Sequence, residues 1–408
     1  MNIPQGYKQT ELGIIPEDWE VKPFSQIFDM YPNNTYPRDC MNDSRGVVRN
    51  IHYGDVLIKY PTIVDAEKCA IPYLNEGVKI KLQKLVQSGD IIIADTAEDE
   101  TVGKCVEIKN VGNNKIVAGL HTFFCRPTSL FAAGWLGYYI NSTNYHNQLI
   151  PYITGIKVSS ISRTAIQETK LLVPPIAEQR AIASALSDVD GLIAALDKKI
   201  AKKRLLKQGA MQQLLTGKKR LHGFIDEWVE KKVKDVFRVT RGYVLATNKV
   251  MERPDGYHKY PVFSSQTQNN GVMGYYSDYL FENAITWTTD GANAGEVNYR
   301  QGKFYCTNVC GVLMSDDGYA NECIASIINM VAKSHVSYIG NPKLMNNVMA
   351  DIEICIPPSI KEQQAIATIL SDMDKEIADL EAQRDKYRLL KSGMMQKLLT
   401  GQIRFKRE

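Results

Sequence analysis

The sequence predicts an α+β protein in which two mixed α/β globular domains are joined by two long helices, packed on each other as an antiparallel coiled coil. Three observations support this prediction. A segment of 40 residues occurs twice, the stretches between the copies barely match, and 408 residues are too many for one ordinary hydrophobic core. Because shared segments frame unlike interiors, we expect an internal repeat with pseudo-twofold symmetry.

The repeated segments, residues 178–217 and 362–401, agree at about 24 of 40 positions. A Pro-Pro pair precedes each copy and no proline lies inside, which is typical of helices. Apolar residues recur at alternating steps of four and three, the spacing of a coiled-coil seam. The seam residues are Ile182, Leu186, Val189, Ile193, Leu196 and Ile200 in the first helix, and Ile366, Leu370, Met373, Ile377 and Leu380 in the second.

The rest of each half predicts a globular domain built mainly from short strands. Trp19 and Trp228 open the two halves, and each is followed nine positions later by a phenylalanine. Runs of β-branched and aromatic residues then alternate with Gly, Asn and Asp, as strands and turns require. One helix-like run occurs in each half, at residues 129–140 and 321–333.

These patterns divide the chain into four parts. The first globular domain covers residues 1–173, and the first conserved helix covers residues 174–217. The second globular domain covers residues 218–356, and the second helix covers residues 357–408.

Composition excludes several classes of protein. Hydrophobic residues make up 44% and charged residues 23% of the chain, as in ordinary globular proteins. No apolar run reaches the length of a membrane-spanning helix, and we see no signal peptide, so we expect a cytoplasmic protein. The eight cysteines form no CxxC pair and are expected to be reduced thiols. The net charge of +4 permits a polyanionic partner without requiring one.

Signals for catalysis are weak. The Pro-Pro pairs lack the polar residue before them and the aromatic residue after them that an amino-methyltransferase loop needs. Asp90, Glu107 and Lys109 imitate the carboxylates and lysine of a metal-dependent nuclease, but the second half has no matching set. The segment Asp290–Gly295 lacks the spacing of a cofactor-binding glycine loop. We therefore predict no catalytic residue and no metal site.

Candidate DNA contacts lie in loops rich in amides, hydroxyls and basic side chains. Asn and Gln can bond adenine edges, whereas Lys and Arg can take guanine or phosphate. The alternative for any one of these residues is an ordinary surface loop. The candidates are Thr96, Thr101, Lys104, Lys157 and Arg163 in the first domain, and Ser265, Gln266, Gln268, Asn269, Asn270 and Lys343 in the second.

At the two helical segments the chain resembles the specificity subunits of type I restriction-modification enzymes. The resemblance is carried by a Pro-Pro pair separated from Glu-Gln by two or three residues, by a heptad helix, and by the sequences LLKQGAMQQLLTGKKR and LLKSGMMQKLLTG. The stretches GYKQTELGIIPEDWEV and VVRNIHYGDV also resemble members of that family.

The resemblance implies a non-catalytic subunit whose two target-recognition domains each recognise one half of an asymmetric, bipartite site in double-stranded DNA. It also implies two methyltransferase subunits that methylate adenine, and restriction and translocase subunits for cleavage. We expect no cofactor in this chain; S-adenosylmethionine, ATP and Mg²⁺ are expected on the partner subunits.

Two other functions stay open on the sequence alone. A single-chain methyltransferase would bind labelled S-adenosylmethionine without partners. A coiled-coil scaffold protein unconnected with DNA would give no gel shift on pooled DNA, even with a methyltransferase partner present.

Overall fold

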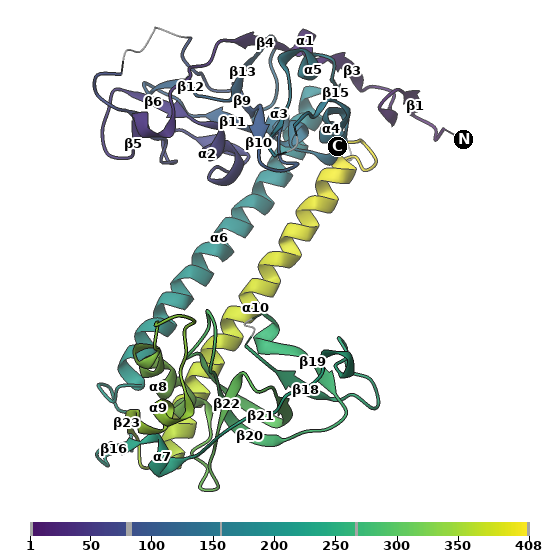
Figure 1. Ribbon diagram of the computed structural model, residues 1–408. Coiled ribbons are helices and arrows are strands. Elements are labelled where there is room, and N and C mark those ends of the chain that lie inside the picture. Colours follow the sequence, from purple (N-terminus) through teal and green to yellow (C-terminus); the bar gives the residue numbers. More distant parts are fainter. Residues whose placement is uncertain (1–2, 79–83, 156, 266–267, 406–408) are drawn as a thin grey trace. The chain divides into compact units, whose positions relative to one another are not determined.

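The computed structural model describes residues 3–78, 84–155, 157–265 and 268–405. The chain forms two compact units: unit 1 comprises Met1–Asp197 and Ala382–Glu408, and unit 2 comprises Lys198–Glu381. Two helices of 39 residues, α6 (Ile176–Leu214) and α10 (Ile360–Leu398), each contribute to both units (Figure 1). Each unit therefore contains one globular domain, the start of one long helix and the end of the other.

Unit 1 is built on a five-stranded sheet of order β4-β13-β9-β11-β7 and a four-stranded sheet of order β12-β6-β8-β5. The central strand β9 is a continuous apolar run because both of its faces are covered. Ile91 and Ile93 face one core cluster, whereas Ile92 and Ala94 face another, as the two-residue period of a strand requires. The strands of these sheets are β4 (Phe28–Tyr31), β5 (Met41–Asn42), β6 (Val48–Ile51), β7 (Ile63–Asp65), β8 (Tyr73–Leu74), β9 (Ile91–Ala94), β11 (Cys105–Lys109), β12 (Lys115–Ala118) and β13 (Thr122–Pro127).

Short ladders and helices complete unit 1. Strand β3 (Glu20–Pro23) pairs with β15 (Lys170–Val173), and β10 (Thr96–Ala97) pairs with β14 (Ser159–Ser160). The remaining elements are β1 (Tyr7–Thr10), β2 (Gly13–Pro16), α1 (Phe24–Ile27), α2 (Tyr53–Ile58), α3 (Trp135–Ile140), α4 (Thr143–Leu149), α5 (Arg163–Gln167) and the 3-10 helices η1 (Arg38–Cys40) and η2 (Ile150–Tyr152). The main core joins α3 to the long helices, because it contains Trp135, Leu186 and Leu398 together.

Unit 2 has one six-stranded sheet of order β17-β22-β20-β21-β18-β19. Helix α8 packs on it through an apolar face, and the same core includes Leu214 and Leu370 of the long helices. The strands are β16 (Val229–Lys232), β17 (Arg238–Arg241), β18 (Tyr260–Phe263), β19 (Val272–Tyr276), β20 (Phe281–Thr288), β21 (Val297–Cys306), β22 (Cys310–Met314) and β23 (Glu353–Ile356), and the shorter helices are α7 (Val233–Val236), α8 (Glu322–Ala332) and α9 (Asn346–Asp351).

The predicted mixture of α and β structure and the predicted long helices are confirmed. One boundary is wrong: the helix expected over residues 129–140 begins only at Trp135, because Gly134 before it has a left-handed φ of 87°. The corresponding run in unit 2 forms α8 almost as predicted. The eight cysteines are free thiols, and no helix in the described ranges combines the length and apolar character needed to span a membrane.

The seam residues fall into two groups by burial. Ile182, Leu186, Val189, Ile200, Ile366, Leu370 and Leu380 are buried, whereas Ile193, Leu196, Met373 and Ile377 are half-buried. Five of the buried members lie in the first turns of the two helices, where a globular domain covers them. The half-buried members follow them, and Ile200 and Leu380 are buried again farther along.

Candidate nucleic-acid interface and helix contacts

A small hairpin in unit 1 brings two candidate residues to one place. Thr154 and Ser160 exchange backbone hydrogen bonds of 3.0 and 2.8 Å and close a hairpin, here called the first hairpin, that carries the exposed Lys157. Thr96 pairs with Ser160 across β10 and β14, and its hydroxyl donates to Asp95 Oδ1 at 2.7 Å. Thr96 and Lys157 therefore belong to one surface of unit 1.

Unit 2 repeats this arrangement. Ser337 and Lys343 exchange two backbone hydrogen bonds of 2.9 Å and close the second hairpin, residues 337–343. Lys343 bridges to Asp290, and its Nζ lies 3.9 Å from Asp290 Oδ1. Asp290 follows interior strand β20 by two residues, as Thr96 follows β9. The two hairpins thus occupy equivalent positions but present different side chains, because the tip of the second exposes Tyr338 and Ile339 by 70% and 94%.

The amide-rich loop before β19 lies on the same side of unit 2. Asn269 and Asn270 are exposed, with φ of 51° and 52°, a left-handed conformation that Asn tolerates better than most residues. The carbonyl of Ser265 accepts a hydrogen bond of 3.1 Å from Asn293 Nδ2, in the turn that also contacts the second hairpin. Gln268 begins the short 3-10 helix η4 (Gln268–Gly271), and Gln266 lies outside the described residues.

The other first-domain candidates are occupied by contacts within the protein. The Lys104 ammonium donates to the Leu57 carbonyl, and burial lowers the pKa of Lys104. Arg163 Nη2 donates to the Met30 carbonyl at 3.0 Å, and Thr101 bonds Asp99 in a turn. The structure does not bring these three side chains onto the first hairpin.

One polar residue beside Thr96 was not among the candidates. His121 Nδ1 lies 3.3 Å from Asp95 Oδ1 and 3.4 Å from the Thr96 hydroxyl, and its ring is exposed. Nothing in the local sequence marks His121, because β9 and β13 bring it to Asp95 across 26 residues. The sequence offered one signal for this surface: polar residues directly follow two interior strands, as Asp95–Thr96 and Thr289–Asp290.

Asp90 and Glu107, whose spacing resembled a metal-dependent nuclease site, form hydrogen bonds within the fold. Asp90 accepts two hydrogen bonds from Arg126, at 2.8 and 2.7 Å. Glu107 accepts from the backbone of Gly134 and Gly137 and so caps the start of α3. Burial raises the pKa of Glu107, and the two backbone donors oppose that shift. Across the described ranges, no three His, Cys, Asp or Glu side chains are placed to hold a metal ion.

The Glu-Gln motif at the start of each long helix makes the same contacts in both units. Glu178 accepts from Trp19 Nε1 at 3.0 Å and from Arg404 at 2.9 and 2.6 Å. In unit 2 the equivalent carboxylate accepts from Trp228 Nε1 at 3.4 Å and from Arg220 at 2.8 and 2.9 Å. That carboxylate is Glu362, and like Glu178 it is buried. The tryptophans that open each half therefore position the long helices.

The following glutamine completes the motif. Gln179 Nε2 donates to the Pro174 carbonyl at 2.8 Å, and Gln363 Nε2 donates to the Pro357 carbonyl at 2.7 Å. Each side chain therefore bonds the first proline of the Pro-Pro pair, which lies just before the helix begins. The Glu178 carboxylate, with Asp18, also raises the pKa of Arg404.

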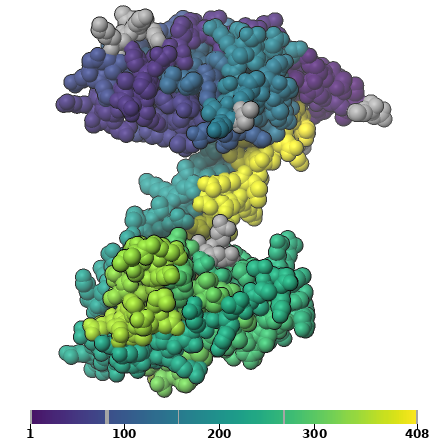
Figure 2. All heavy atoms as spheres, viewed as in Figure 1, coloured from purple at the N-terminus to yellow at the C-terminus, as the bar shows by residue number. Residues whose placement is uncertain are grey.

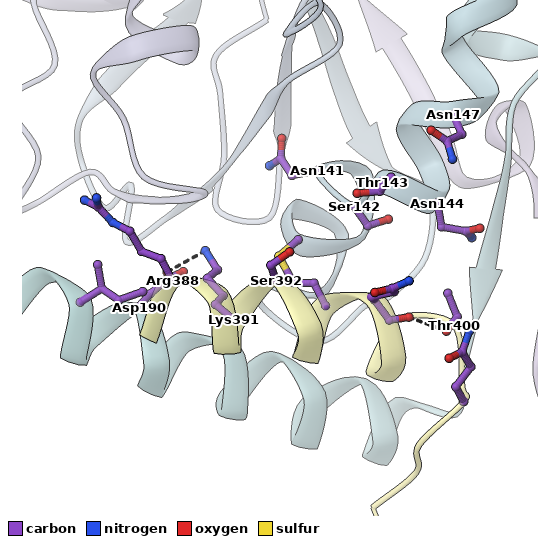
Figure 3. A pocket seen from close by; sticks show the side chains of 14 residues that line it. Asn141, Ser142, Thr143, Asn144, Asn147, Asp190, Arg388, Lys391, Ser392 and Thr400 are labelled. Carbon is purple, nitrogen blue, oxygen red and sulfur yellow. Dashed lines mark hydrogen bonds and ion pairs between the residues drawn. The ribbon is translucent and has the colours of Figure 1, made fainter. Parts of the chain in front are cut away.

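A cavity of about 740 Å³ lies in unit 1 between the α3–α4 region and the long helices (Figure 3). Its walls are mainly amides and hydroxyls, with two cations from α10. The residues that line it include Asn141, Ser142, Thr143, Asn144, Asn147, Asp190, Arg388, Lys391, Ser392 and Thr400. Unit 2 has a cavity of about 1060 Å³ that includes Lys207 and Asp374, the repeat equivalents of Lys391 and Asp190.

A family model matches most of the chain. The model described as the type I restriction modification DNA specificity domain matches residues 16–203 and again residues 225–387. The two matches correspond to the two halves of the internal repeat.

The chain is also similar in sequence to specificity subunits of type I restriction enzymes. The chain is 24% identical over 432 aligned residues to the putative type I restriction enzyme MjaX specificity subunit of Methanocaldococcus jannaschii, covering 98% of this chain and 97% of the relative. It is 41% identical over 142 residues to the putative type I specificity subunit S.MpnORF289P N-terminus of Mycoplasma pneumoniae, covering 34% of this chain and 74% of that one.

Solved structures share the fold. The crystal structure of the type I restriction-modification S subunit from M. genitalium matches with a TM-score of 0.62 at 13% identity, covering 98% of both chains. A chain from a structural study of complex assembly and conformational transition in the type I system matches with a TM-score of 0.55 at 14% identity, covering 95% of this chain and 99% of that one.

Proposed function

Because the chain belongs to the type I restriction-modification DNA specificity family, we propose that it recognises an asymmetric, bipartite DNA site, one half through each unit, and directs its partner subunits there. Members of this family supply DNA specificity and are the non-catalytic component of their enzymes. The observation that carries the proposal is the pair of equivalent hairpins, which pair with the residues that follow matching interior strands but present different side chains. Two hairpins that occupy equivalent positions but expose different side chains are suited to recognising two different half-sites.

The proposed domain organisation follows the sequence boundaries. Residues 1–173 and 218–356 form the two target-recognition domains, and residues 174–217 and 357–408 form the conserved helices. We propose that these helices pack as an antiparallel coiled coil with pseudo-twofold symmetry. Support comes from ion pairs that recur with the repeat: Lys391 pairs with Asp190 in unit 1, and Lys207 pairs with Asp374 in unit 2.

The test of DNA recognition is a map of methylated adenines in cells that express this chain with its methyltransferase partner. The expected result is one bipartite sequence motif that disappears when this chain is omitted. Substituting Thr96 should weaken recognition of the half-site assigned to unit 1, whereas substituting Asn269 should weaken recognition of the other half. Methylation without a sequence motif, or of a motif independent of this chain, would overturn the proposal.

We also propose that two methyltransferase subunits bind the helices at equivalent places. Leu389 and Leu390 of α10 are 75% and 50% exposed, and their repeat equivalents in α6, Leu205 and Leu206, are 68% and 50% exposed. The end of α10 forms part of the visible surface of unit 1 (Figure 2). Paired exposed leucines on a helix are typical of a protein-binding surface, and their recurrence favours two copies of one partner.

Native mass spectrometry of the complex tests this stoichiometry. Replacing Leu389 and Leu390 by aspartate should reduce the bound methyltransferase copies from two to one. Leu192→Asp is the matched control, because Leu192 is 48% exposed on α6 but its repeat equivalent is Glu376. Two retained copies in the double variant would contradict the proposed surface.

The catalytic groups and their cofactors belong, in this proposal, to the partners. S-adenosylmethionine would serve the methyltransferase subunits, and ATP and Mg²⁺ would serve the restriction and translocase subunits. Because the proposed ligand is cellular double-stranded DNA, we place the complex in the cytoplasm. Equilibrium dialysis of the isolated chain with labelled S-adenosylmethionine should show no binding; stoichiometric binding would favour a single-chain methyltransferase.

A further inference from the structure

Arg300 of β21 is a half-buried cation held by neutral groups. Its Cζ lies 3.9 Å from the centre of the Phe263 ring, and its Nε donates to the Thr286 hydroxyl at 3.1 Å. Its Nη1 donates to the Asn270 carbonyl at 2.7 Å. Within the described ranges no ion pair joins a carboxylate to this guanidinium, and Glu296 and Glu322 act on it only from a greater distance. Burial lowers the pKa of Arg300.

These three contacts connect three different parts of unit 2. Thr286 belongs to β20, Phe263 ends β18, and Asn270 belongs to the exposed amide-rich loop. A planar guanidinium with donors in fixed directions is suited to this task, whereas an ammonium has no such fork. Arg300 therefore joins the amide-rich loop to the rigid sheet beneath it.

The loop needs such support because its backbone is in an unfavourable conformation. Asn269, Asn270 and Gly271 have φ of 51°, 52° and 82° in succession. A non-glycine residue in the left-handed region costs of order 1 kcal/mol and persists where surrounding contacts fix it. The Arg300 bond to the middle residue of the three is one such contact, and the Asn293 bond to Ser265 supports the other end of the loop.

We infer that Arg300 is a positioning residue for base recognition by unit 2, holding the amides of Asn269 and Asn270 in the orientation that contacts base edges. The inference rests on the proposed function, because it assumes that this loop meets DNA. Amide side chains discriminate bases only when both of their hydrogen bonds are aligned, so a loose loop would bind DNA with less discrimination. Unit 1 has a different residue at the corresponding point of its sheet, the buried Ile108 of β11, so the effect should be confined to one half-site.

The inference makes a different prediction from direct phosphate contact. A cation that contacts phosphate contributes to affinity for every sequence and to its salt dependence. A positioning residue changes the ratio of affinities between the correct and the altered base pair and leaves the salt dependence unchanged. The distinction can be measured on one set of duplexes.

The experiment uses the full chain in complex with its methyltransferase partner, on the methylated site first mapped in cells. Dissociation constants are measured for the native duplex and for duplexes altered at each base pair, at several salt concentrations. The variants are Arg300→Gln and Arg300→Lys, and the control is Arg253→Gln, an exposed arginine of the same unit. Because the result is a ratio within each variant, partial unfolding alters all dissociation constants alike and does not imitate the effect.

Both Arg300 variants should lose about tenfold discrimination at one or two base pairs of a single half-site. The other half-site and the slope of affinity against salt should match those of the unsubstituted complex, as should all values for the control. Unchanged discrimination would overturn the inference, as would uniform weakening with the slope reduced by about one. If the unsubstituted complex itself shows no base discrimination, the proposed function fails instead.

Discussion

Lys391 Nζ lies 2.6 Å from Asp190 Oδ1 in unit 1, and the contact recurs in unit 2 between Lys207 and Asp374 at 2.5 Å. Both partners shift by the same 184 positions (391 − 207 and 374 − 190). The repeat therefore preserves contacts between the two long helices as well as the helices themselves. An ion pair conserved in this way sets which positions of α6 and α10 face each other within each unit.

A double-mutant cycle on Asp190→Asn and Lys391→Met should give a coupling free energy of about 0.5 to 1 kcal/mol at low salt. The pair is partly exposed, at 32% and 20%, so the coupling should fall as salt screens it. Urea unfolding of the four proteins measures it. The same cycle on Asp374 and Lys207 is the internal comparison. A coupling free energy of zero for both pairs would show that they do not set how α6 and α10 align.

Removing the arginine that pairs with a buried carboxylate should lower the free energy of unfolding far more than breaking the partly exposed pair of Asp190 and Lys391. Arg220→Met leaves Glu362, which is 1% exposed, without its cation, and an uncompensated buried charge typically costs about 3 to 5 kcal/mol. Urea unfolding should register this loss in unit 2. Adding Glu362→Gln to the variant should recover much of it, since the unpaired charge is then gone; a single variant as stable as the unsubstituted chain would contradict the assignment.

Buried seam leucines should matter more than exposed ones on the same helices. Leu186→Ala and Leu370→Ala occupy equivalent positions at 0% and 3% exposure, and each should destabilise its unit by about 2 to 5 kcal/mol. Leu205→Ala, at 68% exposure, should change stability by less than about 0.5 kcal/mol. Thermal or urea unfolding compares the three, and equal losses would refute the burial pattern of the seam.

The sequence was most informative where interactions are local or repeated. Helix periodicity and the Pro-Pro pairs predicted α6 and α10 closely, because both depend on residues within a few turns. The contacts of Glu178 could not be predicted, since they join Trp19 and Arg404 from opposite ends of the chain. Lys104 shows the same limit for the interface: its sequence context is that of an exposed loop, yet its ammonium turns inward to the Leu57 carbonyl.

Lys157 and Lys343 should contribute phosphate contacts on the two hairpins. Lys157→Gln and Lys343→Gln should each weaken DNA binding similarly for all sequences and lower the slope of affinity against salt by about one. Lys104→Gln is the matched control, because its ammonium already bonds the Leu57 carbonyl. Binding of the complex to duplexes over a salt series measures all three, and a slope that changes only for Lys104 would reverse the assignment.

The two ends of the chain segment that forms each globular domain lie side by side, because their strands pair with each other. Glu20, at the start of β3, is the ladder partner of Val173, at the end of β15. In unit 2, Val229 at the start of β16 is the ladder partner of Ile356 at the end of β23. Each domain therefore begins and ends at one place, so it can be removed and replaced without separating the rest of its unit.

Replacing residues 20–173 with the matching segment of a related specificity subunit should change one half-site and leave the other unchanged. The replacement must retain the backbone donor of Ala132, which bonds Gln179 at 3.0 Å, and the Tyr138 hydroxyl, which bonds Asp190 at 2.8 Å, because these join the domain to α6. Mapping of methylated adenines in cells carrying the hybrid measures the outcome, and the reciprocal exchange of residues 229–356 should alter the opposite half-site. If either exchange altered both half-sites, the two units would not recognise DNA independently, and the division of the bipartite site between them would be wrong.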